Sequence, residues 1–359
     1  MENYIKVNEK VIDSHLHIEA WEQEDGANFI DFFDEYIEQS GIETVNIASL
    51  PSGSRNVSNN IMIAFYKLAH KNAFAHGGLV YPEYPAPDKM PEGMDFVTQY
   101  KELMEIGFDG MKMLEGKPSL HKLVGKDLSC DLFDPFYAEL EKDGTHLLFH
   151  VNDPEEFWDE TKVSQELKDL GWCYCDGTYA SNEEVYRQIN RVLEKHPNLC
   201  VNFAHFFFYS YHPEKLEELF AKYPKMGVDL TPGGEMYIAF DQNREYYKDF
   251  FVKYSERIQL GTDSTFPGRI EGCRWLLDRV YRFLATDDVV KSFDDREIKG
   301  INLPKEVREN IFYKNFERTV GKMPKEINKK ALMAYIEKYR CQMTDDENRR
   351  VNELIKRFI

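Results

Sequence analysis

The sequence has no hydrophobic run long enough to cross a membrane and no targeting pattern at its start. No segment approaches roughly 18 unbroken apolar residues, the length that a membrane-spanning helix needs. The first ten residues lack the basic start and apolar run that mark a secretory signal. We therefore expect a soluble, cytoplasmic protein without a membrane partner.

Cysteine is scarce, and acidic residues outnumber basic ones. The six cysteines are scattered through 359 residues without the spacing of a disulfide framework, which is typical of reduced thiols in a cytosol. Cys173 and Cys175 are too close in sequence for an ordinary zinc knuckle, so we interpret them as a loop feature. The formal charge of −18 would repel DNA or an anionic membrane, which excludes nucleic acid as an expected partner.

What the sequence does contain is an alternation of short apolar runs with amphipathic helical patterns, as in parallel βα units. The strand candidates are residues 11–17, 44–50, 73–81, 110–114, 146–151, 200–206, 226–230 and 257–261. The helical patterns cover residues 28–40, 57–70, 96–106, 181–195, 245–255 and 270–284, with another helix opening at Pro213. Eight such units close most economically into a (β/α)8 barrel of the α/β class, the TIM barrel, whereas an open doubly wound sheet would hold the strand ends apart.

Side chains that can bind a metal follow the ends of these strands. His15 and His17 lie two residues apart on the first strand, so they point to the same face. Imidazole is the commonest protein ligand for a divalent transition metal, and the pair makes half of a site. The fourth, fifth, sixth and eighth strands end near Lys112 or Glu115, His150, His205 and Asp263. Because the carboxyl ends of barrel strands converge, these residues predict one metal centre.

The motifs resemble those of the amidohydrolase superfamily, and within it the branch called amidohydrolase 2. The matching residues are Asp13-x-His15-x-His17, His150, Ala204-His205 and Gly261-x-Asp263-Ser264, with a closing helix that leads from Leu303 to Asn315. From this resemblance we expect residues 1–321 to form a metal-dependent barrel domain. Residues 322–359 are expected to form a helical extension packed on the barrel or on a partner subunit, so a homodimer is one expectation.

The resemblance implies a divalent metal, with zinc as the expected ion and manganese or iron as alternatives. The implied ligands are His15, His17, His150, His205 and Asp263. A bound divalent ion lowers the pKa of its water to roughly 7 and can polarise a substrate oxygen. Asp263 would also shuttle a proton, and His205 would bind a second ion or act as an acid towards the substrate.

Lys112 decides how many ions are expected. In two-metal members of the superfamily a lysine at this position is carbamylated and bridges the ions, whereas an unmodified Lys112 would hold a substrate carboxylate or steady Asp263. We favour one ion over two. Glu115 is an alternative ligand or substrate contact, and Arg55 and Arg269 lie in loops from which they could bind an anionic substrate.

The expected activity is hydrolysis of an amide, lactone or related bond in a small polar molecule. The alternative is non-oxidative decarboxylation, because the same branch includes enzymes that remove CO₂ from aromatic or unsaturated acids. A barrel that binds without turnover is disfavoured, because metal ligation alone would not need both Asp263 and His205. The aromatic segment at residues 153–179 follows the fifth strand, so we expect it to cover the mouth as a lid or pocket wall.

Overall fold

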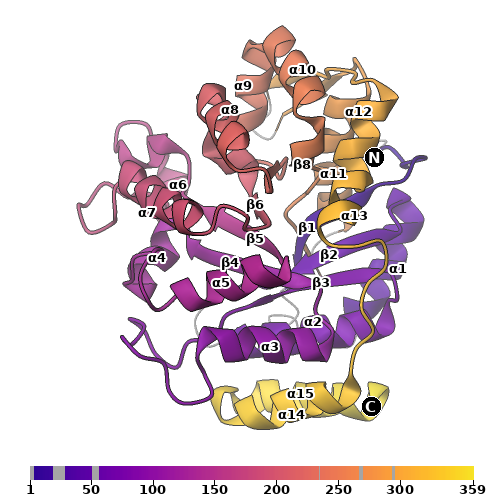
Figure 1. Ribbon diagram of the computed structural model, residues 1–359. Helices are drawn as coiled ribbons and strands as arrows, with labels where there is room; N and C mark the ends of the chain where they lie inside the picture. Colours follow the sequence, from indigo (N-terminus) through magenta and orange to yellow (C-terminus); the bar gives the residue numbers. More distant parts are fainter. Residues whose placement is uncertain (1–3, 19–28, 51–55, 234, 267–269, 293–295) are drawn as a thin grey trace.

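The computed structural model describes residues 4–18, 29–50, 56–233, 235–266, 270–292 and 296–359. Parallel strands form one curled sheet whose neighbours follow one another in chain order from β1 to β8, with helices outside (Figure 1). The strands are β1 Ile12–Ile18, β2 Thr44–Ala48, β3 Ala73–Gly78, β4 Gly110–Gly116, β5 His146–Val151, β6 Val201–Phe203, β7 Met226–Asp229, β8 Ile258–Gln259 and β9 Ser264–Phe266. The predicted (β/α)8 barrel architecture is confirmed, and it brings the strand ends to one mouth.

The end of the barrel differs from the sequence prediction of one strand at residues 257–261. The chain forms the short strand β8, turns at Asp263 with a φ of 59°, and then resumes as β9, which pairs with β1. A residue in the left-handed region interrupts a strand, and sequence periodicity does not reveal it. The segment between the two strands joins β1 through Ser14 N–H to Leu260 O (3.0 Å) and Asp263 N–H to His15 O (2.9 Å).

Helices cover the outside of the sheet close to their predicted positions. They are α1 Phe29–Ser40, α2 Asn56–Ala69, α3 Phe96–Ile106, α7 Asn182–Lys195, α8 Pro213–Lys222, α10 Arg244–Lys253 and α11 Ile270–Ala285. Ser181 caps α7 by accepting a hydrogen bond from Glu184 N–H, as its sequence pattern predicts. Helices α4 Pro118–Val124, α5 Asp134–Asp143 and α9 Met236–Gln242 were not predicted.

Gly107 ends α3 in a conformation that a side chain would not tolerate. Its φ is 109°, and a Cβ added there would lie 2.3 Å from Glu326 O. We expect Gly107→Ala to lower the free energy of unfolding by about 1–3 kcal/mol, measured by urea denaturation. Gly144→Ala is the control, because Gly144 also has a positive φ but open space around it. Equal losses in both variants would contradict a contribution from the contact with Glu326.

The C-terminal extension packs on the outside of the barrel. Helix α14 (Lys329–Tyr339) contacts α2 and α3, and α15 (Asp345–Phe358) contacts α2. Figure 1 shows both helices below α3, on the side away from the strands. Helix α15 begins at Asp345, where Thr344 and Glu347 form a capping box directly at its start. The boundary between two domains at residue 321 stays a prediction.

The segment that follows β5 builds a small apolar cluster of its own. It contains the 3-10 helix η3 (Glu155–Trp158) and α6 (Gln165–Asp169). Buried Phe157, Val163 and Tyr174 form the centre of this cluster, and aromatic neighbours pack around them. Every helix in the described part of the chain is too short or too polar to span a membrane.

Candidate metal centre

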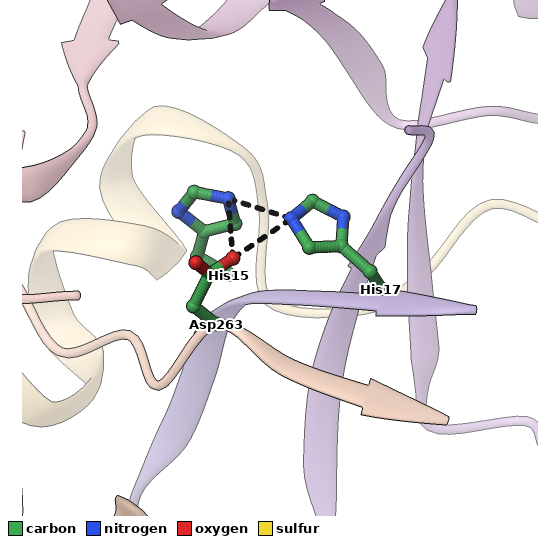
Figure 2. A group of neighbouring side chains, drawn as sticks. All are labelled: His15, His17 and Asp263. Atoms are coloured by element: carbon green, nitrogen blue, oxygen red, sulfur yellow. Dashed lines mark hydrogen bonds and ion pairs between the residues drawn. The ribbon is translucent and has the colours of Figure 1, made fainter. Parts of the chain in front are cut away.

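Three of the predicted ligands converge at the carboxyl ends of the strands. His15 Nε2 and His17 Nε2 are 3.1 Å apart, and Asp263 Oδ1 lies 3.7 Å and 3.0 Å from them (Figure 2). Two ligands of a tetrahedral zinc ion with bonds of 2.0–2.1 Å are separated by about 3.3 Å. The three donor atoms therefore fit around a single ion of this size.

Hydrogen bonds on the far side of each ring direct these donors inward. His15 Nδ1 donates to Asp229 Oδ2 (2.9 Å), and His17 Nδ1 donates to Ala48 O (2.7 Å). Because both partners only accept hydrogen bonds, each Nδ1 carries the proton, and a neutral ring then offers the lone pair of Nε2. Such outer partners commonly fix the tautomer and orientation of histidines that bind metals.

The electrostatics favour the forms of these side chains that bind metal. Burial, with the Lys112 charge, lowers the pKa of His15 to about 4, so its ring is neutral at pH 7. Burial alone would raise the pKa of Asp263, but the adjacent His17 and the other neighbouring histidines hold it well below its usual range. A neutral imidazole and an ionised carboxylate are the states that bind a divalent ion.

Lys112 lies inside the centre. Its buried Nζ donates to His15 Nε2 at 2.9 Å, the nitrogen that faces His17 and Asp263. Burial lowers the pKa of Lys112 to about 8, so its neutral amine is accessible near neutral pH. In its charged form Lys112 competes with a metal for the lone pair of His15.

His150 and His205 line the same cavity but stand outside the compact group of three donors. The ring of His205 lies 5.9 Å from that of His15 and 4.7 Å from that of His150. His150 Nε2 is directed to Asn152 O (2.9 Å) and Asp153 Oδ1 (3.3 Å). Burial lowers the pKa of His150 to about 3 and also lowers that of His205. Their roles as metal ligands stay predictions.

The chain turns through left-handed backbone conformations immediately after β6. His205, Phe206, Phe207 and Phe208 all have φ between 54° and 57°. Such conformations cost roughly 1–2 kcal/mol per residue and occur where surrounding contacts impose them, often at functional sites. One such contact is His205 N–H, which donates to Asp229 Oδ1 at 2.8 Å. Asp229 thus orients both the ring of His15 and the turn that carries His205.

Sequence reasoning missed Asp229, although the barrel rule identifies its position. It is the last residue of β7, and strand ends on this side of a barrel face the site. Its carboxylate is fully buried, and burial alone would raise its pKa. Contacts with His15, together with His205 and Thr231, outweigh that effect and lower the pKa, so the residue is an anion beside the candidate metal ligands.

A cavity of about 300 Å³ opens above the donors. Residues of the centre line it together with Lys117, Asp153, Phe157, Trp172 and Phe208. The prediction that the segment after β5 forms a pocket wall is therefore confirmed. Lys117, also missed from the sequence, donates to both oxygens of Asp153 at 2.9 Å and lies 4.9 Å from the centre of the Trp172 ring.

Of the remaining predicted substrate contacts, the structure describes only Glu115. Glu115 is buried, where its carboxylate accepts hydrogen bonds from Tyr81 OH (2.9 Å) and Leu114 N–H (2.8 Å). Among the described residues that line the cavity, Glu115 does not appear. Arg55 and Arg269 lie outside the described residues. For all three, a role in substrate binding stays a prediction.

Comparison with known proteins agrees with this geometry. A family model described as Amidohydrolase matches residues 12–322. A search of curated proteins finds no match. Similar solved structures include 2,6-dihydroxybenzoate decarboxylase from Rhizobium, with 13% identity and a TM-score of 0.53 over 87% of this chain and 99% of that one. The apo form of IDCase from Metarhizium anisopliae has 13% identity and a TM-score of 0.52 over 87% of this chain and 97% of that one.

An uncharacterised TIM-barrel protein from Bordetella bronchiseptica has 14% identity and a TM-score of 0.52, over 87% of this chain and 100% of that one. At such low identity these structures show a shared fold. The family match, in contrast, spans most of the sequence and includes β1 and the segment with Asp263. The chain therefore belongs to the amidohydrolase family, in the amidohydrolase 2 branch that its motifs resemble.

Proposed function

We propose that the protein is a metal-dependent hydrolase that cleaves an amide, lactone or related bond in a small polar substrate. The observation that carries this proposal is the convergence of His15, His17 and Asp263 below a cavity, with both rings oriented from behind. The proposed cofactor is one zinc ion. When bound, it would supply a hydroxide nucleophile at neutral pH and polarise the substrate oxygen.

Asp263 is the proposed proton acceptor. It contacts both histidines through Oδ1, which leaves Oδ2 to take a proton from the attacking water. His205 is the second proposed catalytic residue. Its Nδ1 lies 3.3 Å from Thr231 O, so a neutral ring donates there and offers Nε2 as a base or ligand. This tautomer favours proton acceptance over the acid role that the family resemblance also allowed.

Lys117 is the proposed contact for an anionic group of the substrate. It lines the cavity beside Trp172, where a flat apolar group could pack, and its side chain is 17% exposed. We expect Lys117→Ala to raise KM by about 10–100-fold with little change in kcat, because a charged hydrogen bond contributes about 1.5–3 kcal/mol. Steady-state kinetics would measure this effect.

Two further variants make the result for Lys117 specific. Lys117→Arg keeps the charge and should recover part of the lost affinity. Lys122→Ala removes an exposed lysine of α4 that stands over Tyr179, and it should leave KM unchanged. A fall in kcat with an unchanged KM in Lys117→Ala would contradict a role in substrate binding.

Decarboxylation is the second candidate, and the lining of the cavity favours it. A decarboxylase needs a cation beside the substrate carboxylate and walls that exclude water. Lys112 beside His15 supplies the cation, and Phe157, Trp172 and Phe208 supply apolar walls. The similar fold of 2,6-dihydroxybenzoate decarboxylase adds support for testing aromatic acids.

Labelled water separates the two reactions. We expect the zinc-loaded protein to incorporate ¹⁸O from labelled water into the organic product of a lactone or amide. Removal of zinc by a chelator should abolish this turnover, and added zinc should restore it. Release of CO₂ from an aromatic acid, without ¹⁸O in the organic product, would establish decarboxylation instead. Activity that survives complete chelation would contradict both candidates.

A further inference from the structure

Two of the six cysteines stand side by side in the segment that walls the cavity. Cys173 Sγ lies 3.0 Å from Cys175 Sγ. Both residues are half-buried, so a small reagent can reach them, whereas Cys200 and Cys273 are buried. The distance exceeds the bond length of a disulfide, 2.03–2.05 Å, by only about 1 Å. The pair is therefore placed for a reaction between its own sulfur atoms.

Tyr174 fixes the backbone between these cysteines. Its N–H donates to Phe157 O at 2.8 Å, and its hydroxyl donates to Asp153, the carboxylate that also binds Lys117. Its ring is buried against Trp158 at 4.9 Å between ring centres. These contacts hold the backbone between the two cysteines in place, which keeps the residues that carry the two thiols close together.

We propose that Cys173 and Cys175 are a redox modification site, which a low-molecular-weight disulfide converts reversibly to an intrachain disulfide. The thiolate of Cys173 attacks one sulfur of the reagent, forms a mixed disulfide and expels the first thiolate. Cys175 then loses its proton, and its sulfur attacks the sulfur of Cys173 and expels the second thiolate. Two protein thiols are oxidised by two electrons, the reagent is reduced to two thiols, and the two protons pass to these products.

A disulfide between Cys173 and Cys175 would close a ring around a single residue, and this makes the disulfide easy to reduce. A crosslink that encloses one residue removes little freedom from the unfolded chain, so it adds little stability. Accessible or strained disulfides have the higher reduction potentials that suit reversible chemistry. The bond would also fix the backbone next to Trp172, whose ring lines the cavity beside Lys117. Oxidation would thus stiffen one wall of the cavity.

Oxidised glutathione is the probe, and the starting protein is the double variant Cys130→Ser/Cys341→Ser, because Cys130 is half-buried, Cys341 is exposed, and both would otherwise react by themselves. We expect the intact mass to fall by two hydrogens, the count of free thiols to fall by two, and peptide mapping to find Cys173 joined to Cys175. Dithiothreitol should reverse all three changes. Amide exchange around Trp172 should be slower in the oxidised protein than in the reduced one.

Replacing one cysteine of the pair tests whether the two thiols react with each other, because the remaining thiol then has no partner in the pair. Adding Cys175→Ser should leave Cys173 with one glutathionyl group and no loss of two hydrogens. The proposal is overturned if both thiols remain free, if each carries its own glutathionyl group, or if either joins a different cysteine. These readouts need no enzymatic activity, so the result is independent of the proposed reaction.

Discussion

Replacing His17 with alanine is expected to reduce bound zinc from one equivalent to a trace. It should also lower turnover by on the order of 10³-fold or more. The substitution removes one of three donors that lie within 3.7 Å of one another. The other nitrogen of His17 contacts a backbone carbonyl, that of Ala48, so we expect the barrel to remain folded. Elemental analysis and kinetics would measure the loss, and circular dichroism would check the fold.

A graded series separates loss of a ligand from general damage. Asp229→Asn keeps all three donors but weakens the contact that orients His15, so zinc affinity should fall by about 10–100-fold. His212→Ala is the control, because His212 is only half-buried, lies away from the three donors and contacts the exposed carboxylate of Glu155. A full equivalent of zinc in His17→Ala would show that this histidine is not a ligand, and the proposed centre would then be wrong.

The two histidine donors on β1 could be predicted from the sequence, because their placement depends only on how side chains alternate along a strand. Alternation along β1 places His15 and His17 on one face, and the structure brings their Nε2 atoms to 3.1 Å. The barrel rule then brings Asp263 from the far end of the chain to the same mouth.

The remainder of the site depends on contacts that periodicity does not contain. The direction of the His150 ring follows from Asn152, whose φ of 71° turns its carbonyl back towards that ring. The pairing of Lys117 with Asp153 joins residues that follow different strands. Position at a strand end was thus predictable, whereas the direction of a side chain required the packed structure.

The second large effect concerns a buried ion pair that joins α2 to β3 and the C-terminal extension. Lys67 Nζ binds Asp109 and donates to Gly107 O at 2.7 Å. The carboxylate of Asp109 also accepts from Ala75 N–H (2.9 Å) and Lys325 N–H (2.8 Å). Both side chains are almost fully buried, at 2% and 3% exposure. One carboxylate therefore links three parts of the chain.

We expect Lys67→Met to lower the free energy of unfolding by about 3–5 kcal/mol, because it leaves the charge of Asp109 buried without its cation. Urea denaturation followed by circular dichroism would measure the change. Lys71→Met is the matched control, since Lys71 is exposed just beyond α2, and its effect should stay within about 0.5 kcal/mol. A loss as small as that of the control would mean that water reaches Asp109 in the variant, and that the pair contributes no more than a surface ion pair does.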